Sequence, residues 1–203
     1  MEYTFNVYNK HAKDGLCMAL DKVLQGYYIK KAAAGNDFSS FSPQETLPVF
    51  VCIGSDLAIG DSLGPITGSM IKYNTQGLHL YLYGTLPSPV TAKEISYMRK
   101  FLRETHKGAP VVAIDAAVGE TDDVGLIKLI DKPLKPGAGA NKKLGAIADV
   151  SILGVVSEKS LHSYGIFNTT RLNLVYKMSE IISCAVGDYL WSIDKSSARV
   201  DVK

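Results

Sequence analysis

The chain has 203 residues, of which 46% are apolar and 21% charged, and its formal net charge at pH 7 is +2. This length and composition are typical of one globular domain with a single core. The small net charge does not favour nucleic acid or an anionic membrane as a partner, and no segment approaches the roughly 20 apolar residues of a membrane-spanning helix. Three scattered cysteines and an amino end without the apolar core of a signal peptide favour a reducing cytoplasm.

Up to about residue 115 the chain alternates between helical and strand patterns. Apolar spacing predicts a leading helix from about Lys10 to Lys31, followed by a Gly/Ser/Pro-rich connector up to residue 47. The next expected elements are strands near 49–53, 78–84 and 110–115, with helices over about 62–73 and 91–106. Such alternation predicts a three-layer α/β/α sandwich with a mostly parallel central sheet, of the phosphorylase/hydrolase-like kind.

The last part of the chain extends the same pattern. A short apolar segment at 125–130 leads to a glycine-rich loop at 135–146, and then to a strand near 150–157. A long amphipathic helix is expected from about Asn168 to Trp191. Because no internal repeat and no interdomain linker interrupts the sequence, we expect one domain over residues 1–203, with 1–47 as its leading helix and connector.

Acidic residues follow two of the expected strands. In "PVFVCIGSDLAIGDSLGP" an apolar strand breaks into a glycine loop that holds Asp56 and Asp61 before a helix begins. In "VVAIDAAVGE" a second apolar strand places Asp115 at its expected carboxyl end, 54 residues after Asp61. Ligands and catalytic groups of open α/β sheets collect outside the carboxyl ends of strands. If the two strands are neighbours, Asp61 and Asp115 face each other.

A pair of close carboxyl groups has a specific chemistry. Ionising both groups is unfavourable because the two negative charges repel each other, so one proton is shared and the two apparent pKa values separate. The ionised partner can take a proton from water as it attacks a peptide carbonyl, and the protonated partner can polarise that carbonyl. This mechanism requires no metal, cofactor or nucleophilic side chain, and none is assigned. Taken singly, each acid has a structural alternative, since Asp61 can cap a helix and Asp115 can cap a turn.

Other residues are candidates for substrate binding around the two acids. Gly54 and Gly60 do not have the spacing of a nucleotide-binding loop, and instead allow a sharp turn that brings a substrate strand near the acids. Asp56 can bond to the pair or to a ligand, or it can form an Asx turn. In the later loop, four further residues are expected to hold substrate over the same cleft: Gly137, Gly139, Asn141 and Lys142.

The glycine-rich loop at 135–146 also has an interpretation without a binding role. Its surroundings, residues 128–143, carry five lysines and one aspartate, a local charge of +4 that exceeds the net charge of the whole chain. A solvated basic loop would explain this charge without any ligand, whereas the functional interpretation has the glycine backbone and lysines hold substrate or tune the acid pair. The sequence leaves both interpretations open.

The segments "IGSDLAIGDSLGP", "VVAIDAA" and "DVSILGVV" resemble the sporulation protein YyaC family, which is similar to the germination protease that degrades small acid-soluble spore proteins. The resemblance covers most of the chain. It implies that Asp61 in "DSLGP" and Asp115 in "IDAA" correspond to the two acids thought to be catalytic in that protease. Hydrogenase maturation endopeptidases are similar over the same two loops, but they also use a histidine to contact a metal. The histidines of this chain lie outside the glycine loop where that residue is expected: His11, His79, His106 and His162.

Two functions follow from this resemblance and from the acid pair. The first is a sporulation-associated endopeptidase of the cytoplasm of the sporulating cell, which hydrolyses a protein or peptide such as a spore protein and can form a homo-oligomer. The second is a non-catalytic sporulation protein that binds a protein partner through the same cleft, since related scaffolds lose activity while keeping their fold.

Overall fold

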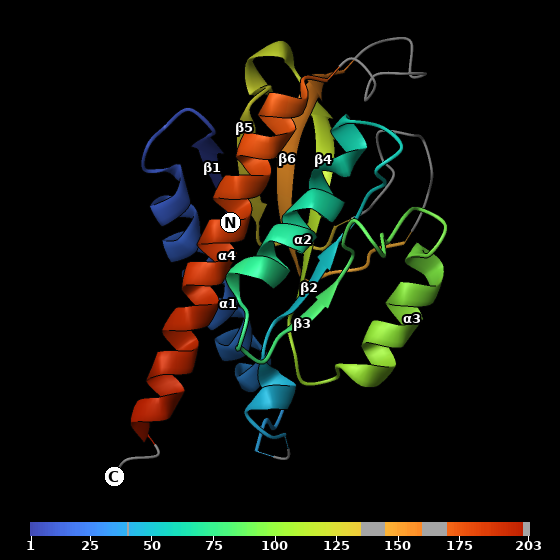
Figure 1. Ribbon diagram of the computed structural model, residues 1–203. Helices are drawn as coiled ribbons and strands as arrows, with labels where there is room; N and C mark the ends of the chain where they lie inside the picture. Colours follow the sequence, from blue (N-terminus) through green and yellow to red (C-terminus); the bar gives the residue numbers. More distant parts are fainter. Residues whose placement is uncertain (40, 135–144, 160–169, 201–203) are drawn as a thin grey trace.

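The computed structural model describes residues 1–39, 41–134, 145–159 and 170–200. Its centre is a six-stranded sheet in the order β1-β5-β6-β4-β2-β3 (Figure 1). The strands are β1 (Glu2–Asn6), β2 (Val49–Cys52), β3 (Tyr81–Tyr83), β4 (Val111–Gly119), β5 (Leu126–Ile130) and β6 (Val150–Glu158). β2 pairs in parallel with β3 and β4, and β4 with β6, whereas β5 is antiparallel to both of its neighbours. The sheet is therefore mixed but mostly parallel, as predicted.

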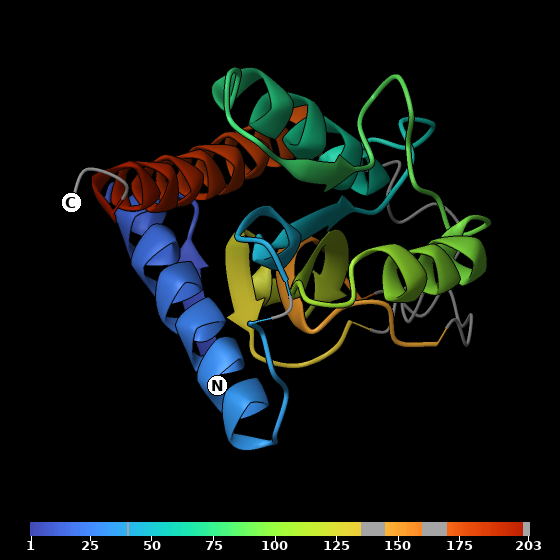
Figure 2. The same ribbon diagram turned by 90° about the horizontal axis from the view of Figure 1, so that it is seen from below.

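Helices cover both faces of the sheet. They are α1 (Ala12–Ala33), α2 (Leu63–Asn74), α3 (Ile95–Thr105) and α4 (Leu172–Val200), with short 3-10 turns η1 (Gln44–Thr46), η2 (Gly60–Ser62) and η3 (Thr121–Asp123). Figure 2 shows α3 apart from the other three helices, across the sheet. Within the described residues, no helix is both long enough and apolar enough to cross a membrane.

The core is divided by the alternation of side chains along each strand. Phe50 and Cys52 of β2 pack with α1, α2 and α4, whereas Val49 and Val51 pack with α3. All four of these side chains are buried, because a parallel strand with helices on both faces is apolar along its whole length. The predicted three-layer α/β/α sandwich is confirmed, and the described residues place α1, α2 and α4 on one face of the sheet and α3 on the other.

Most expected helices and strands are present, with shifted ends. The helix expected over 91–106 begins at Ile95, and the strand expected over 78–84 is reduced to β3 at the sheet edge. The apolar segment at 125–130 forms β5. Strand β1 was not predicted, and it pairs antiparallel with β5 while Tyr3 and Phe5 pack against the core.

Strand β4 differs most from its prediction, and the difference changes the position of Asp115. The strand was expected to end at this residue but continues to Gly119. Its pairing with β2 stops at Cys52–Ile114, whereas its pairing with β6 continues to Gly119–Glu158. Asp115 therefore lies within a strand, one residue past the end of the neighbouring β2. The two strands that lead to the acids are direct neighbours, which is the condition under which Asp61 and Asp115 were expected to face each other.

Candidate active site

Backbone contacts define the loop that joins β2 to α2. Gly54 has a φ of +142°, and a Cβ there would lie 2.0 Å from the carbonyl oxygen of Asp61, so only glycine fits. The N–H of Ser55 donates to the same oxygen at 3.1 Å, and the N–H of Gly54 donates to Val90 O at 3.0 Å. At the far end of the loop, a Cβ on Gly64 would lie 2.0 Å from Ile53 O. These contacts hold Asp61 near the end of β2.

Asp61 lies in η2 and is half-buried. The residue at the start of α2 is Ser62, whose hydroxyl donates to Ile59 O at 2.6 Å. No side-chain cap hydrogen bond is made at the start of η2 or of α2, so the helix-capping alternative for Asp61 is not observed. Burial raises the pKa of the Asp61 carboxyl, and the backbone N–H of Ser55 opposes this effect.

Asp115 is the more deeply buried acid, with 9% of its surface exposed. Its Oδ1 accepts a hydrogen bond of 2.8 Å from the N–H of Ala116, the next residue in β4. Burial raises its pKa to about 8, with the negative charge of Asp61 as the second cause. The charge of Asp61 thus adds to the effect of burial, and both favour the protonated form of Asp115 at neutral pH.

The rest of the loop contains features that the sequence did not indicate. Asp56 is exposed, and the turn beside it is made by Ser55, whose hydroxyl accepts the N–H of Leu57 at 3.2 Å. Leu57 is 91% exposed and Ile59 is 38% exposed, although both are large apolar residues in an otherwise polar loop. The only available signal was their isolation from any apolar strand or helix pattern. They are exposed apolar side chains in the loop that carries Asp61.

Gly60 is buried within η2. The other four proposed binding residues, Gly137, Gly139, Asn141 and Lys142, lie outside the described part of the chain, so their place over the cleft stays a prediction.

Other reactive side chains of the described residues lie elsewhere or are shielded. Among these residues there is no group of three or more His, Cys, Asp or Glu side chains that could hold a metal ion. His106, just after α3, is buried beside Tyr83, whose hydroxyl lies 2.8 Å from its Nε2, and burial lowers the pKa of this histidine. Cys52 is fully buried, and burial raises the pKa of its thiol, which disfavours the reactive thiolate.

The matches to known proteins include a family model, a relative and a solved structure. Residues 28–185 match the family described as "Protein of unknown function (DUF1256)". "Uncharacterized protein YyaC" of Bacillus subtilis (strain 168) is 36% identical over 177 residues, which cover 84% of this chain and 86% of that protein. The crystal structure of a [NiFe] hydrogenase maturation protease HycI from Thermococcus kodakarensis KOD1 aligns with a TM-score of 0.43 and 18% identity, covering 71% of this chain and 92% of that one.

Proposed function

The chain belongs to the DUF1256 family, and we propose that it is an endopeptidase in which Asp61 and Asp115 activate water to hydrolyse a peptide bond. The observation that carries this proposal is the buried carboxyl of Asp115, whose pKa is raised to about 8 by burial and by Asp61. Pairs of acids whose surroundings push their pKa values apart are typical of acid–base catalysis.

The two acids have different roles because they are buried to different degrees. Asp115 is protonated at neutral pH and donates a hydrogen bond to the substrate carbonyl oxygen. The less buried Asp61 is ionised and takes a proton from water as the water oxygen attacks the carbonyl carbon. When the C–N bond breaks, that proton passes to the departing amine, and Asp61 is again a carboxylate. The proton taken from water thus ends on the amine product, and both acids return to their starting protonation states.

The substrate is proposed to be a protein or peptide. The resemblance of "DSLGP" and "IDAA" to the germination protease supports a spore protein in the cytoplasm of the sporulating cell. The exposed Leu57 and Ile59 beside Asp61 provide an apolar surface for a substrate side chain next to the scissile bond.

The proposal is tested by incubating the purified protein with candidate small spore proteins and measuring fragment masses. Asp61→Asn and Asp115→Asn are expected to lower the cleavage rate by about 10²–10⁴-fold each, because asparagine keeps the shape of the side chain but does not exchange a proton with water. The double variant should be scarcely slower than either single one, since the acids act as a unit. Asp122→Asn, which changes an exposed acid of η3, is the matched control.

Two results would contradict the proposal. If both single variants keep the wild-type rate, the acid pair is not catalytic. If the wild-type protein leaves every candidate intact but binds one of them, the non-catalytic alternative is correct, and the cleft serves for partner binding.

A further inference from the structure

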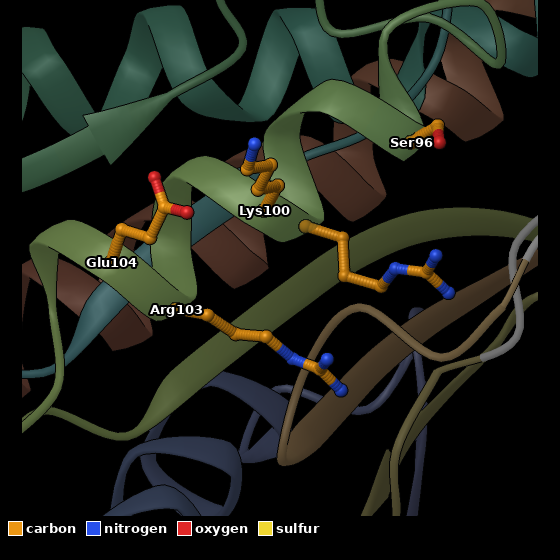
Figure 3. A pocket seen from close by; sticks show the side chains of 5 residues that line it. Ser96, Lys100, Arg103 and Glu104 are labelled. Carbon is orange, nitrogen blue, oxygen red and sulfur yellow. The ribbon is translucent and has the colours of Figure 1, made fainter.

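A hollow of about 420 Å³ lies against α3, on the exposed side of the helix. It is lined by residues from successive turns of α3, namely Ser96, Arg99, Lys100, Arg103 and Glu104 (Figure 3). Their spacing of three and four places them on one broad face of the helix, with Arg99 and Arg103 along one edge and Lys100 and Glu104 along the other. With three cations and one acid, the lining of this α3 hollow is electropositive.

The cations of the α3 hollow have no acidic partners in the described part of the chain. The ion pairs found there involve the amino terminus and the lysines of other elements. Glu94, just before α3, is already engaged, since its Oε2 accepts hydrogen bonds from the N–H and hydroxyl of Thr91 at 2.9 and 2.5 Å. The positive charge of Arg99 and Arg103 is therefore available to a ligand.

Arg99 packs against the backbone although no acid among the described residues forms an ion pair with it. Its side chain is half-buried, and a Cβ on Gly145 would come within 1.9 Å of its Nη1, so the guanidinium lies directly against the backbone of Gly145. Figure 3 shows Arg103 extending on one side of α3, and Lys100 and Glu104 on the other. A partly desolvated guanidinium in a fixed position is suited to bind a carboxylate or phosphate through two parallel N–H···O bonds.

The α3 hollow is on the same side of the sheet as Asp115. Alternate residues of a strand share a face, so Asp115 shares the face of Ala113, which packs in the cluster of Ile95 and Met98 of α3. The connection to α3 also contacts the acid-bearing loop, because Val90 O accepts the N–H of Gly54. A polypeptide bound at Asp115 can therefore continue over α3 without crossing the sheet.

From these observations we propose that the α3 hollow is an anion subsite that binds acidic side chains of the polypeptide substrate. This inference rests on the proposed peptidase function. Arg99 and Arg103, one turn apart on the same edge of the helix, fit two carboxylates in sequence better than one small anion. The substrate class is thus a protein with an acidic segment near the cleaved bond.

The test measures binding of a fluorescein-labelled hexaglutamate peptide by fluorescence anisotropy at low ionic strength, with hexaglutamine as the neutral probe. The Asp115→Asn protein is used, so that hydrolysis does not interfere. In that protein, Arg99→Gln with Arg103→Gln is expected to raise the Kd for hexaglutamate at least tenfold. The matched control, Lys22→Gln with Lys72→Gln, removes the same charge from exposed positions of α1 and α2 and is expected to leave the Kd unchanged. Lys100→Gln provides a second variant if loss of the Arg99 packing unfolds the protein.

Three results would overturn the subsite. Unchanged binding after loss of both arginines would show that the peptide lies elsewhere. An equal loss in the lysine control would show that binding follows net charge alone. Displacement of the peptide by micromolar inorganic phosphate would assign the hollow to a small anion. If instead binding requires both arginines while the wild-type protein cleaves no peptide, the subsite stands and the peptidase function fails.

Discussion

Replacing Asp115 by asparagine is expected to stabilise the folded protein at pH 8. The folded state keeps a proton on Asp115 up to a pH of about 8, whereas the unfolded chain releases it near the ordinary aspartate pKa of 3.8. A raised pKa of this kind contributes stability that is fully present below the unfolded pKa and is lost as pH rises through the folded pKa. Asparagine has no proton to release, and its amide oxygen can still accept the N–H of Ala116.

The size of the effect follows from the pKa values. Each pKa unit corresponds to about 1.4 kcal/mol, so a rise from 3.8 to about 8 corresponds to about 6 kcal/mol in the free energy of unfolding. The loss accumulates at about 1.4 kcal/mol per pH unit between roughly pH 4 and pH 8 and then stops. This is a large fraction of the ~5–15 kcal/mol that stabilises an ordinary domain.

Urea unfolding at pH 5, 6, 7, 8 and 9 measures the effect in the wild-type and Asp115→Asn proteins. Asp61 and Asp149, whose pKa values are also raised by burial, are present in both, so the difference between the two curves isolates Asp115 and its coupling to Asp61. The difference is expected to grow in favour of the variant up to pH 8. The exposed acid Asp122 serves as control through Asp122→Asn. Parallel curves for wild type and Asp115→Asn would refute the raised pKa, and with it the acid role.

Further predictions concern rate, loop geometry and thiol access. The kcat/KM for peptide cleavage should fall above pH about 8, as Asp115 loses its proton, and fall again at low pH as Asp61 gains one; a rate still rising at pH 9 would contradict the assigned roles. Gly54→Ala should lower Tm, because its Cβ would lie 2.0 Å from Asp61 O at a φ of +142°, whereas Gly26→Ala, in α1 with no atom within 4 Å, should raise it slightly; differential scanning fluorimetry compares the two. A thiol reagent should leave the buried Cys52 unmodified in the native protein and should label the half-buried Cys17 and Cys184. Mass spectrometry of the peptides measures this, and labelling of Cys52 at the same rate would show that β2 is accessible to solvent.

The sequence predicted the layers of the fold because buried parallel strands and amphipathic helices differ in local pattern. It also predicted that Asp61 and Asp115 follow buried strands, because each acid comes after an apolar run, but it left open whether those strands are direct neighbours. It did not predict that β4 continues beyond Asp115, since this extension depends on pairing with β6, which comes much later in the chain. Strand β1 was missed for the same reason, because its half-polar pattern becomes a strand only through pairing with β5.

The exposed positions of the candidate site were equally difficult to predict. An apolar residue such as Leu57 gives no local sign of whether a loop will fold over it. The half-buried state of Arg99 depends on the backbone of Gly145, which comes from a different connection of the fold. Both features depend on contacts between distant segments, whereas the acids themselves depend on strand ends, which have a local pattern.

The backbone contacts of the β2–α2 loop separate two properties of the site. The path of the loop is set by Gly54 and Gly64 against neighbouring carbonyl groups, and not by its outward side chains. Asp56, Leu57 and Ile59 can therefore be exchanged while Asp61 stays in place. In the proposed peptidase, substrate preference can diversify at these three positions, by natural drift or in a randomised library, while the acid pair is kept.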